Sequence, residues 1–415
     1  MISKINQIAI LLNWPREYDM YAKLIESLPE ENYHILINDI KGFDKERLGN
    51  SRDIEKLINN KGIREYSFLK EILGKKKFKI VLSTGEACSH RFSLYSFLRW
   101  CYAQTIGRFF DFTNFSIFLK NLFGRPFNAE GKFAVPFTSW FPERIIGEIS
   151  IKYPQGMDLN YIYPDKIWKK YFDIFFTHGL ADTKMISEKF SNKKVFIIGY
   201  PRYDDFLSRR VNSIELKDFY NSNLFNPDKD TILWLPSHIK EKNYYGQNIL
   251  EWLKNLKETT ENYNIILRPH PKTLKTFNKL EDIIKKQKLI VDFEADRKIG
   301  ELINFSKLIL CDYGGPIFSS IYLEKKIVLF NYFKNSKFVK DKIESYSFDT
   351  EVRKFLTNCD LDIDTKSLNK IFDKEIKTDN FKKIKEIKKF YFGDDTKKND
   401  ITDTMKYLLN NLQEK

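Results

Sequence analysis

The feature that most constrains this chain is the alternation of short, β-rich apolar runs with stretches of helical periodicity. The strand candidates are residues 5–12, 33–38, 78–83, 149–153, 173–177 and 194–198 in the first half, and 231–235, 263–267, 289–292, 308–312 and 327–331 in the second. Helical patterns at 17–28, 53–60, 248–259, 275–286, 298–305 and 316–324 separate them. Strands separated by helices are typical of βα units around a parallel sheet. We therefore predict an α/β protein with two Rossmann-like sheets in series.

The length supports two domains. A chain of 415 residues suits two cores of about 200 residues each. Residues 205–230 are rich in Asn, Asp and Ser and lack a strand pattern, so we predict a linker there. The expected units are an N-terminal domain of residues 1–204, a C-terminal domain of residues 231–385 and a helical segment of residues 386–415.

Charge and cysteine content limit the partners and the compartment. The 70 Lys and Arg residues exceed the 56 Asp and Glu residues, and the net charge of +14 favours anionic partners. The basic residues are spread along the chain without a nucleic-acid-binding signature, so nucleic acid is not expected. The four cysteines lie far apart without metal-ligand spacing, which argues against a zinc site or a disulfide framework and indicates the reducing cytoplasm.

One segment, residues 90–125, suggests peripheral contact with a membrane. No run reaches the roughly 18 apolar residues that a spanning helix needs. This segment instead interleaves many aromatic residues with basic ones, as an amphipathic helix in an anionic headgroup layer would. The alternative is a pair of ordinary helices packed on a sheet with solvated basic residues. The basic residues are Arg91, Arg99, Arg108, Lys120 and Arg125.

The turn after the strand at 263–267 is the first candidate site. Its sequence, LRPHPKT, places Arg268 and His270 on the loop, and Pro271 suits the first turn of a following helix. An imidazole, a guanidinium and free backbone N–H groups directed to one point are what a pyrophosphate or a leaving phosphate requires. The alternative is a structural histidine that caps its own loop.

A second turn, DYGGPIFSS, follows the strand at 308–312. Gly314 and Gly315 let the backbone approach a ligand closely, and Pro316 opens a helix. Together with the His-Pro turn, the two glycines suggest the two sides of a nucleotide diphosphate site. Ser319 and Ser320 lie in the first turns of the helix, where they are candidates either for phosphate binding or for capping the helix.

A third turn, LPSHIK, follows the strand at 231–235. It places Ser237, His238 and Lys240 at another strand end of the same predicted sheet. Ligands bind beyond the carboxyl ends of strands in open α/β sheets. We therefore take Ser237 and Lys240 as candidate phosphate ligands, whereas His238 is also consistent with a simply exposed side chain.

These turns, in this order, resemble the CDP-glycerol glycerophosphotransferases of teichoic acid and capsule assembly. The segment VFIIGYPRYDDF is similar to the family's Gly-Tyr-Pro-Arg-Asn-Asp junction between domains, and FYFGDDTKKNDITD is similar to its closing Asp-Gly segment and last helix. The resemblance extends over residues 145–410. The first 140 residues contain no matching motif.

The resemblance implies a GT-B fold, in which two Rossmann-like domains face each other across a cleft and the C-terminal helix crosses back. It implies that the C-terminal domain holds the nucleotide donor, that the N-terminal domain is on the acceptor side, and that no metal or other cofactor is needed. His270 would then contact or protonate the donor phosphate. Arg268 and the turn of Asp312, Gly314 and Gly315 would hold the pyrophosphate.

The family's N-terminal His-Gly-Thr-Pro loop, whose histidine is thought to act as a base, aligns best with YPQGMDL. Gln155 then stands at the position of the family's histidine, followed by Gly156 and Asp158. Glutamine cannot accept a proton at neutral pH, so the acceptor must be activated by another group. Asp158 and Glu86, which is predicted to lie beyond another strand, are carboxylate candidates.

His178, in the segment FTHGLAD, is the candidate substitute base. It follows the predicted strand at 173–177, and Asp182 lies four residues later, where it could orient the ring. A histidine with an ordinary pKa near 6.5 suits general-base catalysis. The alternative is a polar loop histidine.

The predicted activity is transfer of a glycerol phosphate or other polyol phosphate from a CDP-activated donor to a hydroxyl group of a surface polymer. The expected partners are that donor, a lipid-linked or polymeric saccharide acceptor and an anionic membrane surface on the cytoplasmic side. One alternative is a glycosyltransferase using a nucleotide sugar or CMP-sialic acid. The other is a non-catalytic basic protein that binds nucleic acid or lipid.

Overall fold

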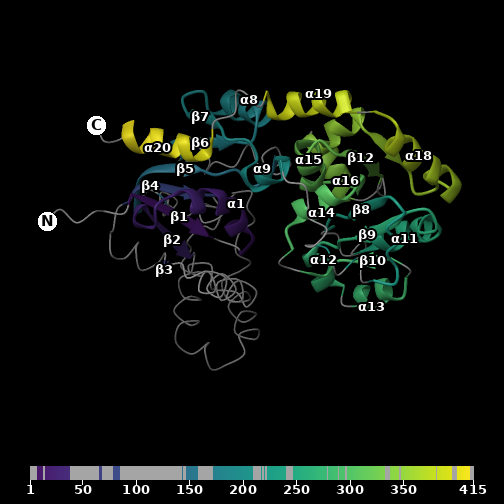
Figure 1. Ribbon diagram of the computed structural model, residues 1–415. Coiled ribbons are helices and arrows are strands. Elements are labelled where there is room, and N and C mark those ends of the chain that lie inside the picture. Colours follow the sequence, from purple (N-terminus) through teal and green to yellow (C-terminus); the bar gives the residue numbers. More distant parts are fainter. Residues whose placement is uncertain are drawn as a thin grey trace, which may run out of the picture.

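The computed structural model contains two α/β domains, each built around its own sheet, with one of the last helices contacting both (Figure 1). It describes residues 7–12, 15–37, 65–67, 78–84, 143, 146–157, 172–208, 216, 219, 222–239, 246–277, 279–287, 289–294, 297–331, 337–344, 347–379, 381–394 and 400–411. The predicted helix at 53–60 and the aromatic and basic segment at 90–125 lie outside these residues.

The N-terminal sheet has seven strands in the order β3-β2-β1-β4-β5-β6-β7. Its pairs are all parallel; β1, for example, lies between β2 and β4, with Ile8 opposite both Tyr33 and Ile80. The central strands are apolar and buried, as a sheet covered on both faces requires. The strands are β1 (Ile8–Leu12), β2 (Tyr33–Ile37), β3 (Glu65–Ser67), β4 (Phe78–Ser83), β5 (Gly147–Lys152), β6 (Ile174–Thr177) and β7 (Lys194–Ile197).

The C-terminal sheet has six parallel strands in the order β10-β9-β8-β11-β12-β13. They are β8 (Thr231–Leu235), β9 (Asn264–Leu267), β10 (Ile290–Val291), β11 (Leu308–Cys311), β12 (Lys326–Phe330) and β13 (Thr357–Cys359). The predicted fold class is confirmed. The sequence prediction missed β3 and β13, because each is a three-residue edge strand without an apolar run.

The first half contains the helices α1 (Pro15–Ser27), α8 (Leu180–Lys189) and α9 (Pro201–Ser208). The second half contains α11 (Gln247–Thr259), α12 (Pro271–Thr276), α13 (Leu280–Lys285), α14 (Ile299–Phe305), α15 (Gly315–Tyr322), α16 (Lys337–Glu344), α17 (Phe348–Glu351) and α18 (Thr365–Lys377). One predicted helix, 275–286, is two helices, because the chain turns at Phe277, whose ring packs against Gly246. The predicted linker at 205–230 begins inside α9.

The chain crosses back to the N-terminal domain through its last helices. Helix α19 (Phe381–Phe392) contacts α15 in one domain and α8 in the other (Figure 1). The helix ends at Gly393, whose φ of +86° favours glycine. Helix α20 (Ile401–Asn411) then packs on α1 and buries Ile401, Met405 and Leu408 in the N-terminal core. The predicted return of the C-terminal segment is therefore confirmed, with a break between two helices.

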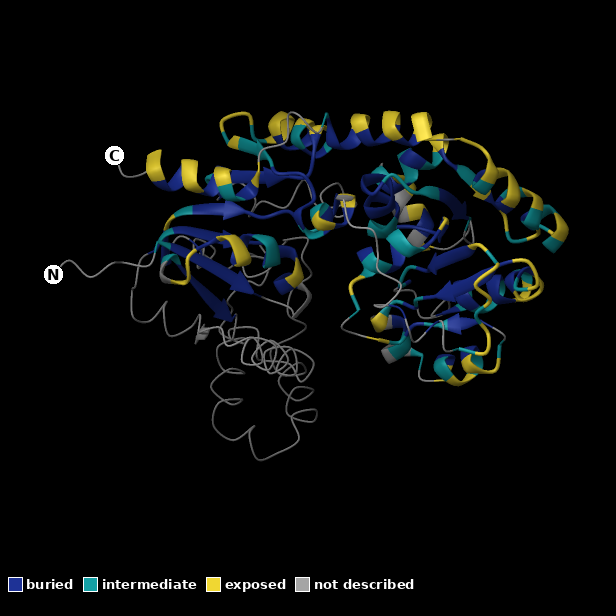
Figure 2. Ribbon diagram, in the orientation of Figure 1, coloured by how far each residue is buried: buried dark blue, intermediate teal, exposed yellow. Residues whose placement is uncertain are grey.

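Both sheets are buried, and the exposed residues lie on the outer faces of the covering helices (Figure 2). The N-terminal core is formed by the strands with α1 and α20, and the C-terminal sheet has a separate apolar cluster on each face. Within the described part of the chain, no helix is both long and apolar enough to cross a bilayer.

Candidate active site

Three of the predicted turns lie next to one another at the carboxyl edge of the C-terminal sheet. Strand β8 pairs with β9 on one side, with Trp234 opposite Leu267, and with β11 on the other, with Leu235 opposite Cys311. The strand order reverses between β8 and β11, and the crevice at such a reversal is where open α/β sheets bind ligands. The turn motifs are thus brought together as the sequence predicts.

The turn after β8 is fixed by a buried carboxylate. The backbone N–H of Ser237 donates to Oδ1 of Asp312 at 2.8 Å, and the amide of Asn248 donates to Oδ2 at 2.9 Å. The same amide reaches the carbonyl of Ser237 at 3.1 Å. Burial raises the pKa of Asp312, while these hydrogen bonds act to lower it. Asp312 therefore clamps two strand ends together through both of its carboxylate oxygens. The expectation that the turn of Asp312, Gly314 and Gly315 holds a pyrophosphate stays a prediction.

Two histidines lie side by side at this edge. The rings of His238 and His270 are nearly parallel, with centroids 5.5 Å apart and an interplanar angle of 27°. Nδ1 of His238 lies 3.1 Å from Oγ1 of Thr273, in the first turn of α12. Both histidines are half-buried, which leaves part of each ring accessible. The sequence placed His238 at a third turn of the same sheet, with a simply exposed side chain as the alternative, and it did not predict that the two rings pack against each other.

Arg268 is engaged by a buried carboxylate. Its Nη1 forms an ion pair with Asp292 and also donates to the carbonyl of Glu294. Nε of Arg297 contacts the other oxygen of Asp292 at 3.2 Å. Arg268 therefore ties the β9 turn to the end of β10. Its guanidinium is engaged by this buried carboxylate, and the expected pyrophosphate contact stays a prediction.

The glycine turn after β11 has the backbone form that was expected, but one amide is already occupied. Gly314 has φ +89° and ψ −162°, a conformation that is essentially restricted to glycine. Its N–H donates to Oδ2 of the buried Asp349 at 2.8 Å. Gly315 begins α15. The turn therefore presents backbone at the site, while Asp349 competes for the position that an anion would occupy.

Ser319 and Ser320 do not face the site. Both are buried, and their hydroxyl groups donate to the carbonyl of Pro316 at 3.1 and 2.7 Å. Serine hydroxyls bond to the preceding helical turn in this way when no other acceptor is near. Their hydroxyl groups bond within α15 and do not cap its start. The expectation that they bind a phosphate stays a prediction.

Arg353, which the sequence did not suggest, ties the neighbouring strand ends together. It donates to the carbonyl of Asp312, to the carbonyl of Phe330 at 2.8 Å and to Oδ1 of Asn331 at 2.7 Å. Its guanidinium lies 4.4 Å from the centroid of the Tyr313 ring. Burial lowers its pKa despite the nearby carboxylates. An isolated arginine in a charged segment gives no sequence signal for such a role.

On the acceptor side, His178 follows β6 and is only 2% exposed. Its Nδ1 lies 2.9 Å from the carbonyl of Gly199, and its ring packs on Tyr200 with centroids 4.2 Å apart. Burial lowers its pKa to about 4. A carbonyl can only accept, so the proton is on Nδ1, and the lone pair of Nε2 has no hydrogen-bond partner among the described residues. The ordinary pKa that the sequence suggested is therefore wrong.

Asp182 does not orient that ring. Its two oxygens accept from the backbone N–H groups of His178 and Gly179, each at 2.8 Å. These N–H groups precede α8, so the carboxylate caps the start of the helix. The carbonyl of Gly199 instead fixes the tautomer of His178, a role that no side-chain motif could reveal.

Gln155 and Gly156 follow the end of β5, at the same carboxyl edge as His178; the glutamine is half-buried and the glycine buried. The neighbouring Lys152 is buried, and its ammonium donates to the carbonyl of Tyr153 at 2.7 Å. Three further candidate residues lie outside the described part of the chain. They are Asp158, Glu86 and Lys240.

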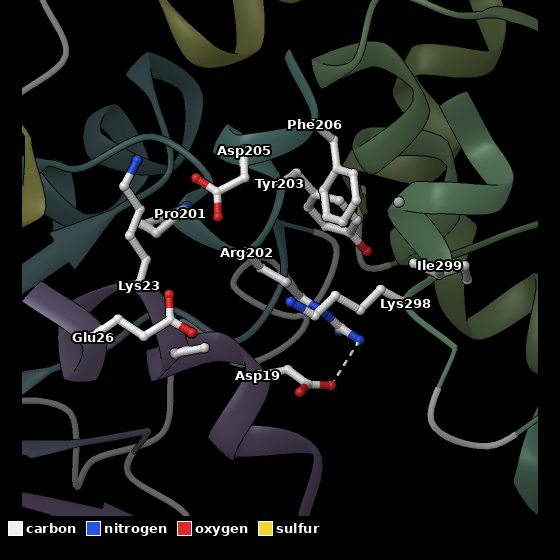
Figure 3. Close-up of a pocket in the computed structure, with 12 residues that line it drawn as sticks. Asp19, Lys23, Glu26, Pro201, Arg202, Tyr203, Asp205, Phe206, Lys298 and Ile299 are labelled. Atoms are coloured by element: carbon white, nitrogen blue, oxygen red, sulfur yellow. Dashed lines mark ion pairs between the residues drawn. The ribbon is translucent and has the colours of Figure 1, made fainter. Parts of the chain in front are cut away.

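The two domains meet at α9. Asp204 accepts a hydrogen bond from the hydroxyl of Tyr322 in the C-terminal domain and lies 3.4 Å from Nζ of Lys23 on α1. A small hollow lies beside this contact, lined by α1, α9 and the start of α14. Figure 3 shows Arg202 reaching Asp19 across it, at 3.7 Å. The junction motif therefore forms the contact between the domains.

No group of three or more His, Cys, Asp or Glu side chains is arranged to hold a metal ion within the described ranges. The polar groups at the carboxyl edge of the C-terminal sheet include two imidazoles and backbone amides. Such groups can bind and protonate phosphate oxygens.

Comparison with known proteins confirms the resemblance over the part of the chain that contains this edge. The family model of CDP-Glycerol:Poly(glycerophosphate) glycerophosphotransferase matches residues 171–341. The teichoic acid poly(ribitol-phosphate) polymerase of Bacillus spizizenii is 24% identical over 145 residues, which are 34% of this chain and 23% of that protein. The chain thus matches about a quarter of the length of this curated relative.

Solved structures confirm the GT-B fold. A variant of the wall teichoic acid polymerase TagF soaked with CDPG has a TM-score of 0.53 at 14% identity, covering 99% of this chain and 91% of that one. MnaA of S. aureus in a co-structure with UDP has a TM-score of 0.51 at 12% identity, covering 98% of this chain and 97% of that one. The likeness shows the same two-domain architecture.

Proposed function

We propose that this protein is a GT-B transferase that moves a glycerol phosphate or other polyol phosphate from a CDP-activated donor to a hydroxyl group of a surface polymer. The family match at residues 171–341 supports this assignment, because it includes all three turns at the carboxyl edge of the C-terminal sheet. The observation that carries it is the half-buried His270, on the turn after β9, one strand away from the reversal of strand order between β8 and β11.

In the proposed reaction, a base takes the proton of the acceptor hydroxyl, and the oxygen attacks the β-phosphorus of the donor in line. The bond between that phosphorus and the oxygen bridging to the α-phosphate breaks, the polyol phosphate is transferred, and CMP leaves with the electron pair. His270 contacts the phosphate of the departing CMP and, when protonated, supplies a proton to it. The protein contributes mainly position and charge stabilisation, as is usual in phosphoryl transfer.

We propose His178 as the proton acceptor, because Gln155 cannot serve. Its hydrogen bond to the carbonyl of Gly199 leaves the lone pair on Nε2, which is the tautomer that a base requires. With a pKa of about 4, the ring is neutral at pH 7, although it is a weak base. The acceptor hydroxyl must displace the groups that cover this ring. Single-turnover transfer at the wild-type rate by His178→Gln would place the base elsewhere.

The decisive experiment identifies the nucleotide that the protein releases. The protein is incubated with CDP-glycerol, CDP-ribitol, CMP-sialic acid and a UDP-sugar, each with a polymeric acceptor, and free nucleotide is separated and quantified. CMP released from a CDP-polyol together with labelled polymer supports the proposal. Release of UDP from the sugar, or of CMP only from CMP-sialic acid, would make the protein a glycosyltransferase. Salt-sensitive DNA binding without nucleotide release would favour a non-catalytic role.

The membrane, acceptor and cofactor expectations complete the proposal. We propose that the protein acts at the cytoplasmic face of an anionic membrane on a lipid-linked or polymeric saccharide. We expect the wild-type protein to float with anionic liposomes, and the variant with Arg91, Arg99 and Arg108 changed to glutamate to stay unbound. Full transfer activity in the presence of EDTA is expected, since we propose that no metal takes part.

A further inference from the structure

We infer that His238 is a second imidazole of the donor site, whose Nε2 contacts the same diphosphate group as His270. This inference rests on the proposed function. It assigns a role to a side chain that neither the turn motif nor the comparisons single out.

The first support is the placement of the two rings. They come from turns after β8 and β9, which are neighbouring strands, and their nearly parallel planes lie 5.5 Å apart at the centroids. A diphosphate carries several oxygen acceptors on two adjacent phosphorus atoms. Two parallel rings at this spacing can each donate a hydrogen bond to a different oxygen of one diphosphate group. A ligand with a single acceptor atom would bond to only one of the two rings.

The second support is the way in which the ring of His238 is held. Its Nδ1 lies 3.1 Å from Oγ1 of the buried Thr273. The backbone N–H of the same threonine donates to the carbonyl of His270 at 2.8 Å, so one residue positions both histidines. When the hydroxyl donates to Nδ1, the ring proton is on Nε2, which makes Nε2 a donor to an anionic oxygen.

The third support is the rigidity of the turn. Ser237 is fixed through its N–H by Asp312 and through its carbonyl by Asn248, and Asn248 is itself buried. A side chain held in place before the ligand arrives loses little conformational entropy on binding. Such preorganisation is what a group that must meet a defined phosphate oxygen requires.

The test compares two substitutions of His238 in which the side-chain amide replaces different nitrogen atoms of the ring. In His238→Gln the side-chain nitrogen can reach the position of Nε2, whereas in His238→Asn it can reach only that of Nδ1. Titration calorimetry with CDP and with CMP measures binding, and thermal melting without ligand checks folding. Lys257→Gln, an exposed change on α11, is the matched control.

We expect His238→Asn to weaken CDP binding about tenfold or more, the effect of losing a hydrogen bond to a charged group, and His238→Gln to weaken it less than about threefold. Thr273→Val, which removes the hydroxyl, should fall between them. If both amide variants bind CDP as tightly as wild type, His238 lies outside the donor site. If the asparagine variant is the tighter of the two, the histidine only supports the turn, and the inference is overturned.

The outcome also separates this inference from the proposed function. Wild-type protein that binds neither CDP nor CMP contradicts both. Wild-type protein that binds them, together with unchanged binding by both amide variants, leaves the proposed function intact and removes only the role of His238. If a His238 variant has a lowered melting temperature, Thr273→Val is used in its place. This smaller change removes the hydroxyl that contacts Nδ1 of His238.

Discussion

The two sheets have the same strand order around their point of reversal, yet their carboxyl edges differ in what they offer a ligand. In the N-terminal sheet the polar groups at this edge are buried and satisfy one another: Ser83 donates to Glu143 at 2.8 Å and Thr84 to Glu17 at 2.7 Å. In the C-terminal sheet two half-buried imidazoles remain at the edge.

This contrast teaches that topology selects the edge, while local hydrogen bonding decides which side chains remain available there. The C-terminal edge uses Asp312, Arg353 and Arg268 to fix its turns, and its two histidines are half-buried. The N-terminal edge buries its own histidine, His178, together with the capping carboxylate. We therefore expect substitutions at the C-terminal edge to change mainly activity, and substitutions at the N-terminal edge, apart from those of His178 itself, to change mainly stability.

The largest expected effect is at His270. His270→Ala should lower nucleotide release by roughly 100-fold or more, the usual contribution of a general acid, because the leaving phosphate loses its proton donor. Melting temperature should stay close to that of wild type, since the ring is not fully buried. Nucleotide release and thermal melting measure the two effects. An unchanged rate would remove this edge from the catalytic site.

The next largest effect is expected at Gly179, where the N-terminal domain meets α19. An added Cβ would lie 2.2 Å from Cα of Phe392 and 2.3 Å from the carbonyl oxygen of Tyr391, which are backbone atoms that cannot easily move. Gly179→Ala should therefore lower the free energy of unfolding by about 3 kcal/mol or more. Chemical denaturation measures this loss. The exposed Lys184→Ala in the same helix is the control, and an equal effect of both would contradict the packing argument.

A third prediction concerns pH. Because the pKa of His178 is about 4 in the folded protein and near 6.5 in an unfolded chain, the unfolded state binds the proton more readily. The stability contributed by the neutral ring is fully present above pH 6.5 and is lost as the pH falls toward 4, by about 3 kcal/mol in total. Denaturation curves across this range should show the slope in wild type and a weaker one in His178→Gln. Parallel curves would mean that another group is responsible.

The smallest expected effect is at Asp182. Asp182→Ala removes the cap of α8 and should cost about 1 to 2 kcal/mol of stability. Asp182→Asn keeps one acceptor oxygen and should cost less. Turnover per folded molecule should be unchanged, because Asp182 accepts from the backbone N–H of His178, whereas the ring is held by the carbonyl of Gly199. A selective loss of turnover would restore the orienting role that the sequence suggested.

The sequence predicted the fold well because the signal is local. Strands such as 78–83 and 231–235 are apolar runs bounded by turn residues, and the structure reproduces their limits. It also predicted the turns that carry His270 and Gly314, because a strand followed by His-Pro or Gly-Gly-Pro marks a strand-to-helix turn. The pairing of the two imidazoles could not be predicted, since it depends on which strands are neighbours.

The sequence by itself determined the α/β class, the two Rossmann-like halves and the turns where chemistry is concentrated, because hydrophobic periodicity and turn residues act over a few positions. Only the tertiary structure decided which groups each of the marked residues contacts. Arg268, Asp312, Ser319 and Ser320 are engaged internally, and His238 joins His270. The physical reason is that buried polar groups must be satisfied by whatever partner the fold brings near, and those partners lie far away in the sequence.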